Sequence, residues 1–305
     1  MSNPKYSFVL SAYKADFLKE AIKSILSQTY RDFELIIVND ASPYDLYSIV
    51  ASFRDDRITY YKNKSNEGGK SLVNQWNKCI EYAKGTYTIM ASDDDLYDSK
   101  FLENVDVLVD KYPHVNVLRG RVVRIDKKNE EIDWEFHLNE WLSQEDFCLF
   151  WSKGIIDCLA NYIYRTSVLK KRGFVDFPHA HYSDVATSFS MADKGIVNCK
   201  DAYFYFRTSE VNLSNSSNKK VVMCQILATM SFFSWLTDFV ERYGKNKKKK
   251  ECVIFFYKNQ YKRMLINLYK KMPFPIFFCH IPKILNDKYL YRKERILMLL
   301  SRFIG

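Results

Sequence analysis

The sequence predicts an α/β fold, a doubly wound mixed sheet with mainly parallel strands, followed by a C-terminal helical extension. In the first hundred residues, short β-rich runs alternate with segments whose apolar residues recur at helical spacing. This alternation is typical of βαβ units. The second observation is charge: from Lys219 onward the chain carries 19 Lys and Arg against 5 Asp and Glu. A mildly acidic body therefore precedes a strongly basic tail, and the 47% hydrophobic content excludes a disordered chain.

Four strands are predicted in the first hundred residues, and helices connect them. The strands are Tyr6–Ser11, Leu35–Val38, Ile58–Tyr61 and Thr86–Ala91. Asp16 is placed to cap the first helix, and the apolar positions from Leu72 to Ala83 predict another helix that Gly85 ends. Because the carboxyl ends of parallel strands meet at one edge, ligand-binding residues are expected just after each strand.

The pattern is less regular after this point. Ser99 is expected to cap a helix through Val109, and a long strand or hairpin is expected over 115–125. Further regular structure is predicted over 162–169, with a helix over 184–194 and a short last strand over 203–206.

The chain is expected to divide at the polar stretch 209–218. Residues 1–215 would form the α/β body, which divides into residues 1–98 and 99–215. Residues 216–305 would form a basic, aromatic-rich helical region, interrupted by the run Lys245–Lys250 and by three prolines. The uncharged run Val221–Thr237 is short and polar for a spanning helix, so a buried or interfacial helix is expected.

The cysteines and the N-terminus predict a cytoplasmic protein. Seven Cys without a CxxC pair argue against a disulfide framework and against a structural zinc site. The first residues lack the apolar stretch of a signal peptide.

Polar residues follow the predicted strands at the ligand-binding edge. Neither GxGxxG nor GxxxxGK[ST] occurs, which argues against dinucleotide oxidoreductases and P-loop NTPases. Instead Asp40 ends the second strand, and Asp93-Asp94-Asp95 follows the fourth. Consecutive carboxylates favour a hard divalent cation, although a solvated acidic turn with a helix cap would give the same pattern.

Several blocks together resemble family 2 glycosyltransferases, which are inverting, nucleotide-sugar-dependent enzymes with the GT-A fold. The blocks occur in order over about residues 5–215, and they are Ser7–Tyr13, Leu26–Leu35, Val38–Ser42, Asn66–Gly68, Asn74, Lys84–Tyr87, Ser92–Tyr97, Tyr164–Leu169, Gly173-Phe174, Tyr182–Asp184 and Tyr205–Arg207. The chain departs from the family pattern at Lys14, where Asn is usual, and at Asn39, Ser92 and Ser183.

The resemblance implies that residues 1–215 form a GT-A glycosyltransferase domain, with a nucleotide-sugar-binding half (1–98) and an acceptor-binding half (99–215). It also implies roles for individual residues. The expected nucleotide-sugar-binding residues are Ser11, Tyr13, Asp40, Lys70 and Asp93, with Tyr13 against the base and Asp40 accepting the imide hydrogen of uracil. Asp94 and a second candidate, Asp95, are the expected ligands of Mn²⁺ or Mg²⁺. Asp184 is the expected catalytic base, although a helix start is also where an ordinary capping aspartate lies.

The resemblance thus implies transfer of a sugar, expected to come from a UDP-sugar, to a hydroxyl of a glycan or lipid-linked glycan, as in bacterial surface polysaccharide synthesis. A sugar-nucleotide pyrophosphorylase would need a Gly- and Arg-rich loop after the first strand, which 11–15 lacks. Two competing interpretations are a catalytically degenerate relative and a protein that binds nucleic acid or anionic membranes through its tail.

The tail also implies a partner. Lys and Arg beside large aromatic side chains over 219–305 are typical of helices on an anionic bilayer. Peripheral attachment to the inner membrane face is therefore expected, with no specific nucleic acid. A helical subdomain that packs its aromatic residues on the body would have the same composition, and both interpretations can hold together.

Overall fold

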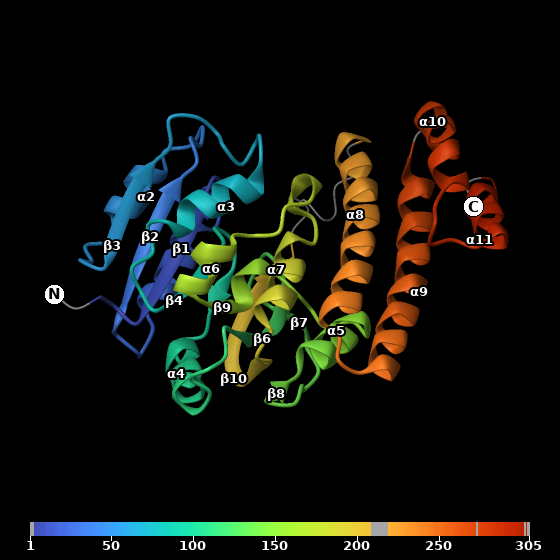
Figure 1. Ribbon diagram of the computed structural model, residues 1–305. Helices are drawn as coiled ribbons and strands as arrows, with labels where there is room; N and C mark the ends of the chain where they lie inside the picture. The colour runs from blue at the N-terminus through green and yellow to red at the C-terminus, as the bar shows by residue number, and fades with distance from the viewer. Residues whose placement is uncertain (1–2, 209–218, 273, 302, 304–305) are drawn as a thin grey trace.

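The computed structural model describes residues 3–208, 219–272, 274–301 and 303. Figure 1 shows a sheet with helices on its two faces, followed by α8 and α9 as two long helices side by side. The sheet order is β3-β2-β1-β4-β9-β6-β10-β5, with β7 paired to β6 and β8 paired to β10. The strands are β1 (Tyr6–Ala12), β2 (Phe33–Asn39), β3 (Ile58–Lys62), β4 (Tyr87–Ala91), β5 (Leu96–Tyr97), β6 (Val117–Ile125), β7 (Glu131–Trp134), β8 (Trp141–Leu142), β9 (Tyr162–Arg165) and β10 (Ile196–Arg207).

The sheet is mixed, as expected. Strands β3, β2, β1 and β4 are parallel neighbours, and β6 is parallel to β10. Strand β9 is antiparallel to both β4 and β6 and joins these two parallel groups. The last strand is longer than the predicted 203–206, because β10 begins at Ile196 and continues through a register shift between Cys199 and Tyr203.

Helices α1 (Leu18–Leu26), α2 (Leu46–Ala51), α3 (Leu72–Ile80) and α4 (Phe101–Lys111) lie between the strands of the first half. Two predicted caps are wrong. Phe17 and Lys100 occupy the N-cap positions of α1 and α4, and neither helix has a side-chain cap, so Asp16 and Ser99 do not cap them. Helix α3 ends at Ile80, before Gly85.

Buried side chains of the central strands form two separate cores, one on each face of the sheet. Successive residues of a strand point to opposite faces. Accordingly Phe8 and Leu10 lie in one core and Val9 in the other, and Ile37 and Ile36 of β2 divide in the same way. Both faces are thus covered, which explains the continuous apolar runs of β1 and β2.

The C-terminal helices belong to one of these cores. They are α8 (Lys219–Tyr243), α9 (Lys247–Lys271), α10 (Phe274–Leu285) and α11 (Arg292–Leu300). The body contributes α5 (Gln144–Ser152), α6 (Thr166–Arg172), α7 (Ser183–Met191) and the short turns η1 (Leu159–Asn161) and η2 (Pro178–Ala180). Trp151 of α5 stacks on Tyr257 of α9 with ring centroids 5.2 Å apart, and Tyr182 stacks on Phe232 of α8 at 4.6 Å.

Part of the tail therefore packs its aromatic residues on the body, as one of the two interpretations of its composition requires. The sequence predicts that the basic run Lys245–Lys250 interrupts the helices. The break between α8, which ends at Tyr243, and α9, which begins at Lys247, includes only the start of this run, and the rest of the run is helical. One helix among the described residues, Lys220–Tyr243, has the length and composition to cross a membrane, and 44% of its most apolar window is buried inside the protein. The predicted division at 209–218 lies outside the described residues, so the domain boundaries stay a prediction.

Candidate active site

Ligand-binding residues are expected where the strand order reverses, because the connections diverge there and leave a crevice. In this sheet the reversal falls between β1 and β4, since β2 and β3 lie on the other side of β1. Tyr13 and Lys14 follow β1, and Asp93 and Asp94 follow β4, so both predicted motifs meet at this point. Ser11, near the end of β1, accepts a hydrogen bond from Gln75 at 3.3 Å.

Asp40 follows β2 and is only 4% exposed. Its Oδ1 accepts hydrogen bonds from Asn63 Nδ2 (2.7 Å) and the Glu67 N–H (2.9 Å), and its Oδ2 accepts one from the Gly68 N–H (2.7 Å). A carboxylate offers about four acceptor sites. These three bonds fix the loop that carries Lys70 and leave one acceptor site for a ligand.

Lys70 lies on that loop with an exposed side chain. Its Nζ is 3.4 Å from both Ser65 Oγ and Glu67 Oε1. The loop approaches Asp40 closely, because a Cβ on Gly68 would lie 2.9 Å from Asp40 Oδ2. Asp40 thus positions Lys70 through the backbone of the loop.

Asp93 connects the two strand ends. Its Oδ2 accepts hydrogen bonds from the backbone N–H groups of Tyr13 (2.8 Å) and Lys14 (2.7 Å). Burial raises the pKa of Asp93, and these two hydrogen bonds partly offset that rise. The Tyr13 side chain is 41% exposed and is free to lie against a planar ligand.

Asp94 and Asp95 have different surroundings. Asp94 Oδ2 forms an ion pair with Lys14 Nζ at 3.1 Å, and both side chains are partly exposed. Asp95 is 4% exposed; its Oδ1 accepts a hydrogen bond from the Arg207 N–H at 2.8 Å, and Ser92 donates to its Oδ2. Burial, and then the charge of Asp94, raise the pKa of Asp95 to about 7. Asp94 is therefore the more accessible of the two predicted metal ligands.

The acidic turn alone does not form a metal cage. Among the residues that the structure describes, no three His, Cys, Asp or Glu side chains converge as a metal site. Mg²⁺ usually binds one or two carboxylates and completes its shell with water and substrate phosphates. The partly exposed Asp94 carboxylate fits this mode.

Asp184 lies in the first turn of α7, as predicted. The N-cap position belongs to Tyr182, whose φ of 70° is in the left-handed region, and no side chain caps the helix. Asp184 therefore does not act as the ordinary capping aspartate. The Val185 N–H donates to its Oδ1 at 2.9 Å. Burial, and then the charge of Asp157, raise the pKa of Asp184 to about 7, which suits a base working near neutral pH.

Cys158 relates the acidic turn to Asp184. Burial raises the pKa of the Cys158 thiol, and the charges of Asp95, Asp157 and Asp184 raise it further. The two motifs, about ninety residues apart in the sequence, therefore both act electrostatically on this one thiol.

Two buried arginines that sequence reasoning did not assign hold this arrangement. Arg207, fully buried at the end of β10, donates its Nε to the Asp94 carbonyl oxygen at 2.7 Å and its Nη2 to Glu20 Oε2 at 3.1 Å. Its own backbone N–H also binds Asp95, so Arg207 shapes the acidic turn from a distant strand.

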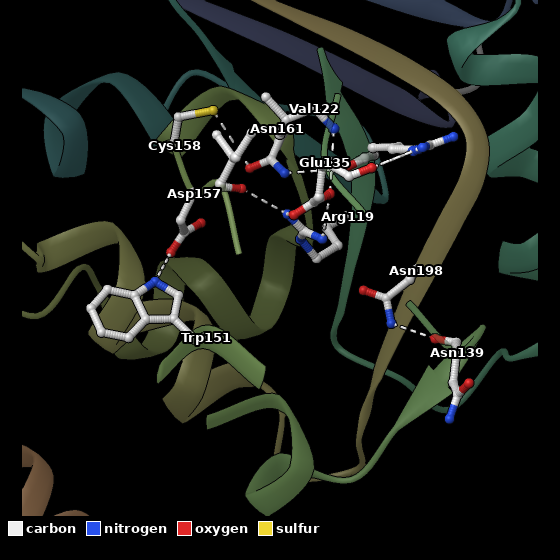
Figure 2. A network of polar contacts seen from close by, with 12 residues as sticks. Arg119, Val122, Glu135, Asn139, Trp151, Asp157, Cys158, Asn161 and Asn198 are labelled. Atoms are coloured by element: carbon white, nitrogen blue, oxygen red, sulfur yellow. Dashed lines mark hydrogen bonds and ion pairs between the residues drawn. The ribbon is translucent and has the colours of Figure 1, made fainter. Parts of the chain in front are cut away.

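Arg119 is the second buried arginine, and Figure 2 shows its polar contacts. It forms a two-point ion pair with Glu135 at 3.0 and 2.7 Å and donates to the Ile156 carbonyl oxygen at 2.9 Å. The next residue, Asp157, accepts from Trp151 Nε1 at 2.9 Å. This network holds the segment that carries Asp157 and Cys158, and nothing in the local sequence around Arg119 indicates it.

Comparisons with known proteins relate this chain to glycosyltransferases. EpsE of Bacillus subtilis, a putative glycosyltransferase by name, is 36% identical over 121 residues, which are 38% of this chain and 42% of EpsE. The chain thus spans less than half of that relative. The Escherichia coli protein WfaP, a UDP-Glc:α-D-GlcNAc-diphosphoundecaprenol β-1,3-glucosyltransferase by name, is 24% identical over 213 residues, 68% of this chain and 79% of WfaP.

The fold is also that of a solved structure. Residues 1–349 of S. aureus TarS, in complex with UDP-GlcNAc, align with a TM-score of 0.65 and 15% identity, covering 98% of this chain and 87% of that one. This likeness confirms the predicted GT-A fold with its C-terminal helices. The family model for Glycosyl transferase family 2 matches residues 7–173, more than half of the chain. The chain therefore belongs to glycosyltransferase family 2.

Proposed function

We propose that the protein is an inverting glycosyltransferase that moves a sugar from a nucleoside-diphosphate donor to a hydroxyl of a glycan or lipid-linked glycan. The observation that carries this proposal is the partly buried Asp184 carboxylate in the first turn of α7, whose pKa burial and the charge of Asp157 raise to about 7. A carboxylate of this kind takes a proton from a hydroxyl at neutral pH far better than an ordinary aspartate does.

The reaction is a single displacement. The acceptor hydroxyl oxygen attacks the anomeric carbon while its proton passes to the Asp184 carboxylate. The bond from that carbon to the diphosphate breaks, and the nucleoside diphosphate leaves with the electron pair. Attack from the face opposite the leaving group inverts the anomeric centre.

Asp94 would hold a divalent Mn²⁺ or Mg²⁺ ion together with the donor, and Asp95 is the second candidate ligand. Such an ion stabilises the negative charge that develops on the leaving diphosphate. Asp93 acts differently in this proposal: it fixes the backbone of Tyr13 and Lys14, and it would contact the ribose or the sugar of the donor.

The donor is proposed to be a UDP-sugar. Tyr13 would lie against the uracil ring, next to Ser11, and Asp40 would accept the imide hydrogen with its remaining acceptor site. Cytosine has no such hydrogen at this position. The TarS complexes hold UDP-GlcNAc or UDP, and WfaP is named for a UDP-glucose donor and a lipid-linked acceptor, which supports this choice.

The decisive experiment measures thermal stability against UDP, GDP, CDP and dTDP, each with Mn²⁺ and with EDTA. A ligand at 100 times its Kd adds about 2.7 kcal/mol to the free energy of unfolding. We expect UDP to give the largest shift, and Asp94→Ala to lose the part that Mn²⁺ adds. A larger shift with another nucleotide would refute the Asp40 assignment, and no shift with any of them would favour a degenerate relative.

We also propose that the protein acts in the cytoplasm, at the inner face of the membrane, through the exposed aromatic rings Phe274, Phe278 and Phe303. These side chains are 45%, 55% and 60% exposed, and the ring centroids of Phe274 and Phe303 are 5.8 Å apart. The exposed Lys270 and Lys271 end α9, just before α10, and would pair with anionic lipid headgroups.

Sedimentation with phosphatidylglycerol vesicles tests this attachment. We expect salt-sensitive binding that the double variant Phe274→Ser, Phe278→Ser loses. Phe255→Ser is the matched control, because Phe255 is 64% exposed on α9 and lies outside these rings. Retained binding in the double variant would refute the proposal. Binding to single-stranded RNA but not to vesicles would instead favour a nucleic-acid-binding tail.

A further inference from the structure

The Lys14 ammonium forms an ion pair with the Asp94 carboxylate of the acidic turn, and Lys14 stands where the family usually has Asn. Its Nζ lies 3.1 Å from Asp94 Oδ2, and its side chain is 35% exposed. The residue lies two positions after the end of β1, at the reversal of strand order where a donor is expected to bind. Its position is fixed, because the Lys14 N–H donates to Asp93 at 2.7 Å.

The three aspartates have different hydrogen-bond and ion-pair partners. Asp93 accepts two backbone N–H groups, and Asp95 accepts one N–H and the Ser92 hydroxyl. Asp94 instead has the Lys14 ammonium beside it. A divalent ion that binds Asp94 must therefore share this carboxylate with Lys14.

A lysine ammonium has three N–H donors. One is directed at Asp94, so the others remain for an anion that approaches from the exposed side. The ion pair is partly exposed and adds little stability by itself. A bound diphosphate would be a reason for a cation at this position, since its negative charge would otherwise add to that of Asp94.

We propose that Lys14 is a donor-binding residue that contacts the diphosphate of the nucleotide and supplies part of the positive charge that a divalent metal alone would otherwise provide. The proposal rests on the proposed function. It implies that nucleoside diphosphates bind this protein measurably without metal, and that Lys14 and the metal compete for Asp94.

Calorimetric titration with UDP, and with GDP in parallel, tests both consequences without measuring turnover. In EDTA, we expect Lys14→Ala to weaken the binding of the nucleotide about 10- to 100-fold, the range of one charge-assisted hydrogen bond. Lys14→Arg should keep most of the affinity. Lys19→Ala, which removes the same charge from an exposed position on α1, is the matched control and should bind as the wild type does.

The second measurement follows Mn²⁺ through its electron paramagnetic resonance signal, in the presence of saturating UDP. We expect Lys14→Ala and Lys14→Asn to bind Mn²⁺ more tightly than the wild type, because Asp94 is no longer shared. Two variants are used so that a folding defect in one, detected by its melting temperature, does not decide the result.

The outcomes separate the two proposals. Wild type that binds no nucleoside diphosphate, with or without metal, refutes the proposed function and this inference with it. If the wild type binds the nucleotide only with Mn²⁺, the proposed role of Lys14 is refuted but the proposed function is not. The same holds if Lys14→Ala leaves the affinity for the nucleotide in EDTA unchanged. In these last two cases Lys14 is a surface ion pair, and the glycosyltransferase proposal stands.

Discussion

Replacing Asp184 by Asn should remove transfer and also make the folded protein more stable at alkaline pH. The pKa of Asp184 rises from 3.8 to about 7 on folding. Between these values the native state holds a proton that the unfolded state has lost, so the stability of the wild type falls as pH rises from about 4 to about 7. Asn cannot ionise and avoids this loss.

The shift corresponds to about 4 kcal/mol at 1.36 kcal/mol per pH unit. Because the side chain is partly exposed, water lowers the cost, and we expect about 2–4 kcal/mol. For a chain of 305 residues, the melting temperature should rise by about 3–6 °C at pH 8. At pH 5 the native aspartic acid is still neutral but the unfolded one has ionised, so only a little over a third of the loss has accumulated and the difference in melting temperature should be about a third as large.

The assay is a pair of melting curves at pH 5 and pH 8, with Asp56→Asn as the control on an exposed side chain. Asp95 also has a raised pKa, but it is present in both proteins and cancels from the difference. An equal difference at the two pH values would refute the reasoning. Asp184 would then lack the surroundings that make it a base, whatever the activity of the variant.

Two further predictions concern the scaffold. Glu135→Gln should lower the free energy of unfolding, measured by urea denaturation, by about 3–5 kcal/mol, because it leaves the Arg119 charge buried without its ion-pair partner. The double variant Arg119→Met, Glu135→Leu should regain most of this stability. An unchanged urea midpoint for Glu135→Gln would contradict the prediction. Gly120→Ala should cost about 1–3 kcal/mol, since its Cβ would lie 2.9 Å from the Ala202 carbonyl oxygen and against the Phe101 ring. Wild-type stability for that variant would mean that β6 and β10 can move apart.

Local patterns predicted the regular elements well where packing and sequence agree. The apolar runs of β1 and β2 predicted buried parallel strands because each strand is covered on both faces. Capping was predicted less well: Asp16 and Ser99 are good capping residues by type, yet the helices begin one residue later. The exact start of a helix depends on how the preceding loop packs, and the sequence window does not contain that information.

The sequence by itself determined the family, the mixed sheet and the positions of the acidic residues after β2 and β4, since these depend on residue types at short spacing. Only the tertiary structure decided how those carboxylates differ. Asp94 faces Lys14, whereas Asp95 is buried against Arg207 of β10, 112 residues away. Burial and neighbouring charge set the chemistry of each carboxylate, and both come from segments that meet only when the chain folds.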